Sequence, residues 1–542
     1  MTDAETRAAD ARAQERAAIT YSYDGPSMRE ATDALEEKKE KFREMGGAER
    51  VQRQHDQGKL TVRERIALLY DGGTFLETGI LAHHQSQSPA MQGKVTPGDG
   101  VITGVGEIAG RKVAVIAYDF TVMAGSMGMV TEIKATRMRE LALRERIPLV
   151  WLIDSAGARI QEATGSMFAR TGDLFREQVL MSGVVPQVAA MMGPGAAGTA
   201  YIPGLADFVP MVKGTSNMAL AGPHLVKAAV GEDVTAEEMG GSKVHCKVSG
   251  VADLEVADDP ACIDAIRKYL SFFPSSNQDP LPIHGSDPVE RRAEELLDIV
   301  PANPRQAYDI HKVIAAIADD GDFFPMKPDW ARNLVTGFAR FGGRPAGIVA
   351  NQPKFLGGAL DVNAADKAAR FVWLCDAFNI PLVFLMDCPG FIVGSAVEKQ
   401  GIIRHGAKML FAVSEATVPK ITVVLRKGYG AGYYVMNGRA FEPDLIVAWP
   451  TAEISVMGPE GAVNIIGRKQ IEALPEDQQA EARNAMVAMI REQISPYVAA
   501  GWSFVDDLID PADTRTVIVR GLEMSATKKV ERPWRKHGVL PV

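Results

Sequence analysis

Four loops of small residues are the segments of this sequence best suited to chemistry. They are residues 155–159, 193–198, 388–391 and 428–433. Each follows an apolar run, and two of these runs end in an acid, Asp154 and Asp387. Glycine and alanine leave main-chain N–H groups open to a ligand, and one such amide can stabilise a developing oxyanion by on the order of 3 kcal/mol. The loops therefore indicate catalysis by backbone amides.

Side chains that could act as nucleophile or base are hard to find beside these loops. The nearest approach to a nucleophile elbow is residues 124–128, which lack its first glycine, so we interpret Ser126 as loop structure. His224, His245 and His405 stand alone, and we interpret each as a surface or hydrogen-bonded core residue. The base would then come from the substrate or a cofactor.

The loops occur in two copies at one spacing. Four pairs of landmarks lie 233 residues apart: Arg111 and Arg344, Lys134 and Lys367, residues 147–154 and 380–387, and residues 185–186 and 418–419. A single interval held without a gap predicts an internal duplication. Short β-branched runs that alternate with helical stretches are typical of an α/β fold. We therefore predict two homologous domains, residues 1–283 and 284–542, joined by a linker near residues 275–288 that is rich in Pro, Ser and Asp.

Residues 29–70 precede the first copy and are charged and mostly helix-forming. Leu35 and Phe42 lie seven residues apart, and Gly46 and Gly47 should end that helix. We expect a helical arm that packs on the body of the protein or on another subunit.

Composition excludes several classes of protein. Lys and Arg number 59 against 68 Asp and Glu, a net charge of −9, which argues against a nucleic-acid partner. The four cysteines form no C-x-x-C pair, so neither a disulfide framework nor a metal site is expected. The N-terminus has no apolar segment of a signal peptide, and apolar runs such as 147–153 are far short of a membrane span. We expect a cytoplasmic protein with no membrane partner.

Longer motifs give the chain a family resemblance. They include DSAGARIQE at 154–162, GPGAAGTAYIP at 193–203, GIVANQPKFLGGALD at 347–361 and AWPTAEISVMGPEGAVNII at 448–466. In these the chain resembles the carboxyltransferase (β) subunits of biotin-dependent acyl-CoA carboxylases, in particular the propionyl-CoA carboxylase β-chain type. The resemblance implies two tandem crotonase-like domains, the first on the acyl-CoA side and the second on the biotin side. Carboxybiotin on a separate carrier chain would donate its carboxyl group to the α-carbon of an acyl-CoA, and biotin would then serve as the base.

The resemblance also implies roles for the small-residue loops. The amides of Ala156 and Gly157 would stabilise the enolate, and those of Ala431 and Gly432 the ureido oxygen of biotin. Further contacts would come from Gly195, Ala196, Ala197 and Gly198 with the acyl-CoA, and from Gly390, Phe391 and Gly430 with biotin. Arg159 and Lys134 are candidates for the CoA phosphates, with ordinary helix salt bridges as the alternative interpretation.

Tyr434 departs from the family pattern, because similar members carry a smaller residue there, often Asp, which is associated with acyl-chain choice. Propionyl-CoA is the expected substrate, with acetyl-CoA or another small acyl-CoA possible. The biotin-acceptor pattern Ala-Met-Lys-Met is missing, and Lys408 in GAKM is only an echo of it. Biotin should therefore arrive on a biotin carboxylase and carrier (α) subunit.

The resemblance suggests a homo-hexamer of these subunits and no metal. Two alternatives remain open: a subunit of a biotin-dependent acyl-CoA decarboxylase coupled to a membrane pump, and a non-catalytic platform that binds the carrier.

Overall fold

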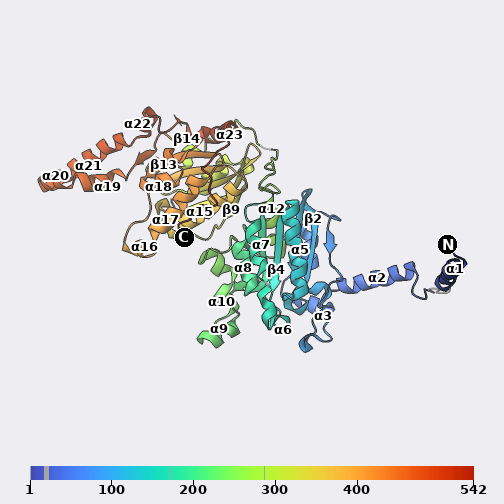
Figure 1. Cartoon of the computed structure of the whole chain (residues 1–542). Coiled ribbons are helices and arrows are strands. Elements are labelled where there is room, and N and C mark those ends of the chain that lie inside the picture. The colour runs from blue at the N-terminus through green and yellow to red at the C-terminus, as the bar shows by residue number, and fades with distance from the viewer. Residues whose placement is uncertain (1, 18–22, 171, 286) are drawn as a thin grey trace.

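Two sheets of equal topology organise the chain in a computed structural model that describes residues 2–17, 23–170, 172–285 and 287–542 (Figure 1). The described residues form one eight-stranded sheet in the order β1-β2-β3-β4-β5-β6-β8, with β7 beside β5. The second has the order β9-β10-β11-β12-β13-β14-β16, with β15 beside β13. An α/β fold built from a duplication is thus confirmed.

The strands of the first sheet are β1 Leu76–Thr78, β2 Val101–Ile108, β3 Arg111–Tyr118, β4 Leu149–Ser155, β5 Gln187–Ala196, β6 Pro210–Val212, β7 Asn217–Ala219 and β8 Leu254–Val256. Those of the second are β9 Phe323–Met326, β10 Leu334–Phe341, β11 Arg344–Asn351, β12 Leu382–Cys388, β13 Lys420–Tyr429, β14 Leu445–Ala448, β15 Glu453–Ser455 and β16 Asp507–Leu508. From β2 to β5, each strand of the first sheet begins 233 residues before its counterpart in the second.

The helices up to the end of the first copy are α1 Asp3–Ala17, α2 Met28–Arg43, α3 Ala48–Asp56, α4 Val62–Leu69, α5 Met129–Glu145, α6 Ile160–Ala163, α7 Asp173–Met181, α8 Gly198–Leu205, α9 Pro223–Val230, α10 Ala236–Gly240, α11 Ser242–Lys247 and α12 Asp259–Leu270. Those that follow are α13 Leu296–Ile299, α14 Ile310–Ile317, α15 Val362–Ala377, α16 Ser395–Lys399, α17 Ile402–Glu415, α18 Gly430–Val435, α19 Pro459–Ile466, α20 Arg468–Glu472, α21 Glu476–Gln493, α22 Pro496–Gly501 and α23 Thr514–Met524.

Successive side chains of the central strands point to opposite faces of the sheet and so pack into separate cores. In β4, Trp151 and Ile153 pack into a core on one face of the first sheet, whereas Val150 and Leu152 pack into another core on its opposite face. That second core also takes in side chains of β12, β13 and α15, so it joins the two copies. Strands buried on both faces read as continuous apolar runs, which explains the sequence pattern.

The linker region 275–288 has no helix or strand among its described residues, while residue 286 lies outside the described part of the chain. His284 within it is anchored by its amide, which donates to the carbonyl of Gly343 at 3.1 Å. Along the chain, the first sheet precedes this region, within residues 76–256, and the second sheet follows it, within residues 323–508. The exact domain boundary at residue 283 stays a prediction.

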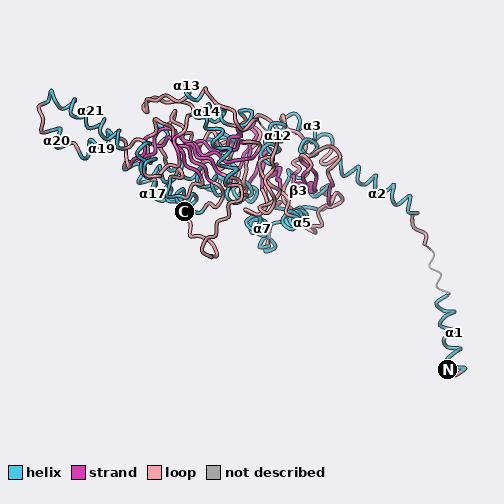
Figure 2. The backbone as a smooth tube through the Cα atoms, turned by 90° about the horizontal axis from the view of Figure 1, so that it is seen from above, coloured by secondary structure: helices cyan, strands magenta, loops and turns pink. Residues whose placement is uncertain are grey.

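Two arms leave the body in opposite directions (Figure 2). The first is α2, which ends at Arg43 just before Gly46 and Gly47 and has no buried residue. The second is formed by α19, α20 and α21 and has a small core of its own, made by Val463, Ile471, Ile490 and Ile494. We refer to residues 459–494 as the C-terminal arm; the sequence motifs gave no indication of it.

Within the described residues, no helix combines the length and the apolar character that crossing a membrane requires.

Candidate active site

The two small-residue loops of each copy lie against one another. Gly157 has φ +89°, and a Cβ added there would lie 2.7 Å from the carbonyl oxygen of Ala196. In the second copy, a Cβ on Gly432 would lie 3.0 Å from the Cα of Gly390. Backbone can approach backbone this closely only because glycine stands at each contact. The predicted loops are therefore brought together in pairs, one pair per sheet.

The amides of the first pair differ from the prediction. The N–H of Ala156 donates to the carbonyl oxygen of Ala124 at 2.9 Å, and that of Gly157 to the Oγ of Ser155 at 3.1 Å. Ala197 also donates internally, to the carbonyl oxygen of Ala219 at 3.1 Å. Gly198 follows as the first residue of α8, where amides have no partner within the helix. The first pair therefore presents Gly198 more openly than Ala156 and Gly157.

Gly195 and Ala196 serve the structure of this loop. Gly195 is buried, with the methyl of Met191 only 2.6 Å from where its Cβ would be. The carbonyl oxygen of Ala196 accepts from the hydroxyl of Thr199 at 2.8 Å. Of the four predicted residues, Ala197 is exposed and Gly198 is half-buried.

One backbone position has a positive φ in both loop pairs. Gly430 has φ +56° and Ala197, 233 residues earlier, has φ +53°. Ala431, exposed at the start of α18, therefore matches Gly198 of α8. Gly432 comes next and is buried.

The loop at residues 388–391 is held by backbone pairing and by one aromatic contact. Phe391 forms a bridge with Leu360, and its ring lies 3.3 Å from where a Cβ of Gly406 would be. Gly390 accepts at its carbonyl from the amide of Leu360 at 3.0 Å. Burial raises the pKa of the neighbouring Cys388 thiol to about 12, so this thiol stays protonated at neutral pH.

A buried carboxylate ends the central strand of each copy. Asp154 accepts from Lys59 at 2.7 Å, from Arg65 at 2.9 Å and from Gln54 at 2.9 Å. All three donors come from the segment α3–α4 that precedes the first sheet. The positive charges of Lys59 and Arg65 balance the negative charge of the Asp154 carboxylate. Asp154 therefore anchors the loop that follows it and is not placed to act as a base.

Asp387 repeats the arrangement with different donors. It accepts from the Nε of Arg426 at 2.9 Å and pairs with the Nζ of Lys427 at 3.3 Å. Both cations belong to the adjacent strand β13. The sequence analysis missed the cations of both sites, because only Asp154 and Asp387 stand out as strand ends.

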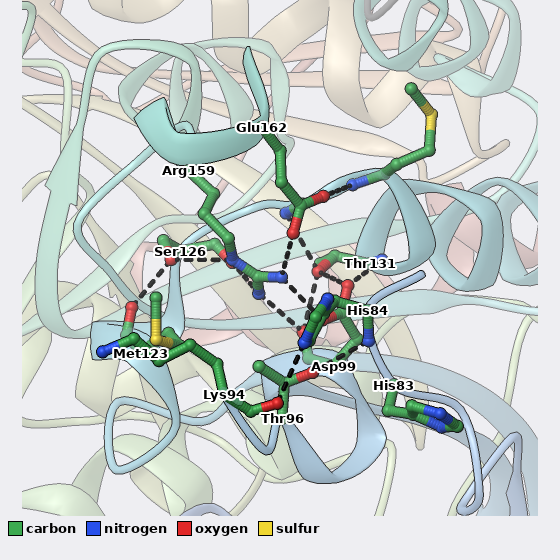
Figure 3. Close-up of polar contacts among 12 residues, drawn as sticks. His83, His84, Lys94, Thr96, Asp99, Met123, Ser126, Thr131, Arg159 and Glu162 are labelled. Atoms are coloured by element: carbon green, nitrogen blue, oxygen red, sulfur yellow. Dashed lines mark hydrogen bonds and ion pairs between the residues drawn. The ribbon is translucent and has the colours of Figure 1, made fainter. Parts of the chain in front are cut away.

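Arg159 is fully buried and joins the segments around the first loop pair (Figure 3). Its guanidinium donates to Asp99 at 2.6 Å, to Glu162 at 3.0 Å and to the carbonyl oxygen of Ser126 at 2.9 Å. Every one of these partners is internal. This geometry argues against the predicted contact between Arg159 and the CoA phosphates and makes Arg159 a positioning residue.

Lys134 is likewise engaged inside the protein. Its ammonium donates to the carbonyl oxygens of Gly98 at 2.8 Å and Val101 at 2.5 Å. Lys367, its counterpart in the second copy, donates to the carbonyl oxygen of Leu334 at 2.7 Å. Both lysines therefore fasten the start of β2 or β10, and Lys134 is not free for a phosphate.

The remaining candidate side chains lie as the sequence analysis interpreted them. Ser126 donates to the carbonyl of Met123 at 2.7 Å, and His245 binds the carbonyl of Met218 at 2.9 Å. His405 and Lys408 both contact Asp366, at 2.8 and 2.9 Å. No cluster of three or more His, Cys, Asp or Glu that could hold a metal occurs in the part of the chain that the structure describes.

Tyr434 lies on α18, two residues after Gly432. Its side chain is exposed, and its ring is stacked on Phe441 with centroids 6.0 Å apart. The phenol therefore stands beside the second loop pair and is accessible to a ligand there.

Comparison with known proteins decides the family. Residues 53–540 match the family described as "Carboxyl transferase domain". The chain belongs to the carboxyl transferase family. It is 46% identical over 518 residues to the propionyl-CoA carboxylase carboxyltransferase subunit of Haloferax mediterranei, covering 95% of this chain and 100% of that protein.

Two other similarities bear on the activity. The methylmalonyl-CoA decarboxylase subunit alpha of Veillonella parvula is 45% identical, covering 95% of this chain and 100% of that protein. A crystal structure of transcarboxylase 12S, described as a hexamer with methylmalonyl-coenzyme A and methylmalonic acid bound, has a TM-score of 0.92. It is 46% identical and covers 96% of this chain and 100% of that one. The predicted family, the crotonase-like carboxyltransferase fold and the enzyme class are confirmed.

Proposed function

We propose that this chain is the carboxyltransferase subunit of a biotin-dependent acyl-CoA carboxylase, with propionyl-CoA as its acyl substrate. The observation that carries the proposal is the pair of equivalent loops, each presenting main-chain amides at the carboxyl ends of the central strands, in a member of this family. The propionyl group is supported by the similarity to the Haloferax subunit.

In the proposed reaction the first copy binds the acyl-CoA and the second binds biotin. Carboxybiotin, brought by a separate carrier chain, would supply the carboxyl group and then the base for the α-proton. The amides of Ala431 and Gly432 would stabilise the ureido oxygen. Because Ala156 and Gly157 donate internally, we assign the enolate oxygen chiefly to Gly198. Preorganised donors of this kind act without reorganisation during the reaction.

The described side chains near both loop pairs fit this division of work. Asp154 and Asp387 are neutralised by cations, and the thiol of Cys388 is protonated, so the carboxylates and the thiol next to the loops hold structure. Proton removal by a group of the substrate pair is consistent with that placement.

We further propose a homo-hexamer in which an acyl-side loop pair of one subunit faces a biotin-side loop pair of another. The two pairs belong to different sheets of one chain, yet the acyl thioester and biotin must meet. The similar transcarboxylase 12S is described as a hexamer. An antiparallel pairing of subunits would create two such sites at once.

The direct test uses the full-length chain, free biotin and methylmalonyl-CoA. We expect biotin-dependent conversion to propionyl-CoA, measured by chromatography of the thioesters. Absence of turnover with malonyl-, methylmalonyl- and ethylmalonyl-CoA by a folded protein would contradict the proposal.

A substitution at Gly198 tests the reassigned enolate site. Gly198→Pro removes the N–H at the first position of α8, where proline is accepted, and should lower kcat roughly 100- to 1000-fold. Because proline also restricts the residue before it and Ala197 has φ +53°, thermal unfolding curves and KM for methylmalonyl-CoA establish that the variant is folded and binds substrate. Gly198→Ala keeps the amide and meets only ordinary contacts, the nearest at 3.5 Å to Met127, so it serves as the control. Equal activity of the proline variant and the wild type would return the enolate to Ala156 and Gly157.

A decarboxylase subunit is the second candidate, since the Veillonella decarboxylase subunit is nearly as similar as the carboxylase subunit. Affinity purification from the native cell distinguishes them. Recovery of a biotin carboxylase supports the first function, and recovery of a membrane subunit supports the second.

A further inference from the structure

The loop at residues 428–433, on the proposed biotin side, is joined to a side-chain network. Its counterpart in the first copy, residues 193–198, cannot form this network. The hydroxyl of Tyr429, the last residue of β13, donates to Glu453 of β15. The other carboxylate oxygen of Glu453 accepts from the Nε of Arg491 at 2.9 Å. Strand pairing places Ala196 and Asn217 at the equivalent positions of the first sheet. Alanine has no hydroxyl to donate, so the network belongs to the second copy alone.

Tyr429 stands directly before the proposed biotin amides. It is the residue before α18, and Gly430 follows it with φ +56°. The side chain is buried, and its ring lies 3.2 Å from where a Cβ of Gly458 would be. The ring is therefore enclosed between the loop and the start of α19, so its position and that of the loop are linked.

Arg491 ties the same network to the C-terminal arm, whose three helices project from the second copy (Figure 1). It lies on α21 and also pairs with Glu460 of α19 at 3.5 Å, which in turn accepts from Arg305 at 2.9 Å. The amide of Ile454 donates to the carbonyl oxygen of Ile494 at the base of the arm, at 2.9 Å. Polar and backbone contacts thus join the arm to β15, next to the biotin-side loop.

The charges in this network favour a fixed geometry. Glu453 is buried between a phenol donor and a guanidinium, and hydrogen bonds to charged groups are about twice as strong as neutral ones. Burial, together with the adjacent carboxylate, raises the pKa of Tyr429, so its hydroxyl remains a donor. Amides that stabilise a reacting oxygen must be held within about 0.5 Å of the productive position, and a locked neighbouring side chain provides that restraint.

The geometry points to Tyr429, Glu453 and Arg491 as positioning residues for the biotin half of the reaction. They hold the segment 430–432 in place and make its position depend on the C-terminal arm. This inference rests on the proposed function.

The test measures both substrates separately on the full-length chain, with free biotin and methylmalonyl-CoA as the probes. Tyr429→Phe and Arg491→Met should each raise KM for biotin about tenfold, as expected for loss of one hydrogen bond to a charged group. KM for methylmalonyl-CoA should stay within about twofold, because the acyl-side loops lie on the other sheet. Thermal unfolding curves establish that the variants are folded.

Three matched variants sharpen the result. Arg491→Lys keeps a cation and should recover part of the affinity for biotin. The double variant Tyr429→Phe/Arg491→Met should be no worse than either single change, because both remove the same network. Arg468→Met, which breaks an exposed pair with Glu472 at 2.8 Å elsewhere on the C-terminal arm, should behave as wild type.

Two results would overturn the inference: a biotin KM of Tyr429→Phe equal to that of wild type, or a parallel rise in KM for both substrates, as general loosening of the structure would give. A wild-type chain that shows no biotin-dependent turnover would instead contradict the proposed function, so the two failures are distinguishable.

Discussion

Ala197 and Gly430 occupy the same backbone position in the two copies, with φ +53° and +56°. Glycine adopts this conformation freely, whereas alanine does so only at a cost. The loop at residues 193–198 therefore carries a strained residue immediately before Gly198. Such strain persists where the surrounding structure determines the loop, which agrees with a functional role for the amide that follows.

Tyr434 is the residue most open to a prediction about specificity. It is exposed beside the second loop pair, and its ring is stacked on Phe441. Tyr434→Asp should change the relative kcat/KM for acetyl-, propionyl- and butyryl-CoA in the reconstituted enzyme while leaving the fold intact. In the proposed hexamer this surface faces the acyl-side loops of another subunit, and the change removes a bulky exposed ring from it. An unchanged preference order would remove Tyr434 from the acyl pocket.

The loops could be predicted at the residue scale, but their free amides could not. The repeat places residues 156–157, 197–198 and 430–432 at strand ends from sequence alone. Whether Ala156 has a free N–H depends on the carbonyl of Ala124, which belongs to a loop with positive φ. A hydrogen bond of this kind leaves no periodic trace in the sequence.

Among the elements, the segment from α3 to α4 also binds the first sheet. Lys59, Arg65 and Gln54 of this segment contact Asp154 at the buried end of β4. Asp154 in the first copy therefore depends on a segment outside the repeat, whereas Asp387 takes its cations from β13. Such long-range pairing cannot be read from helical spacing, which predicted only that the arm packs against something.

Removing one of the cations that pair with Asp154 should lower the free energy of unfolding substantially. Lys59→Met leaves a buried carboxylate partly uncompensated and should lower the free energy of unfolding by about 3 kcal/mol. Arg53→Met on α3 breaks an exposed pair with Glu49 and should change it little. Urea denaturation at one fixed protein concentration compares the two. Equal effects of both substitutions would contradict the buried-pair account.

For the whole molecule, the contact between the copies contains a titratable group. A cavity of about 390 Å³ lies between Ser182, Gly183 and Asp207 of the first copy and Arg370, Trp373 and Phe378 of the second. Burial raises the pKa of Asp207 to about 6, and its carboxylate accepts from the amide of Gln187 at 2.8 Å. The duplicated sheets thus meet across a group that changes charge near neutral pH.

The sign of this effect follows from proton linkage. Folded Asp207 has a pKa of about 6 against the ordinary 3.8, so between these values the folded state holds more protons and stability falls as pH rises. Asp207→Asn can still accept from Gln187, and its stability relative to wild type should rise by about 2 kcal/mol between pH 4 and pH 7. Unfolding of both proteins across that range is the measurement, and a pH-independent difference would contradict it.

Lys134 and Lys367 give the duplicated design one more property. Each places its amino group among carbonyl oxygens at the start of its sheet. Burial lowers the pKa of Lys134 to about 8 and that of Lys367 to about 7, so the buried amino group of the second copy already loses part of its charge at neutral pH. The two copies therefore carry different charge at the same position of one duplicated framework, and the start of β10 responds to a rise in pH before the start of β2.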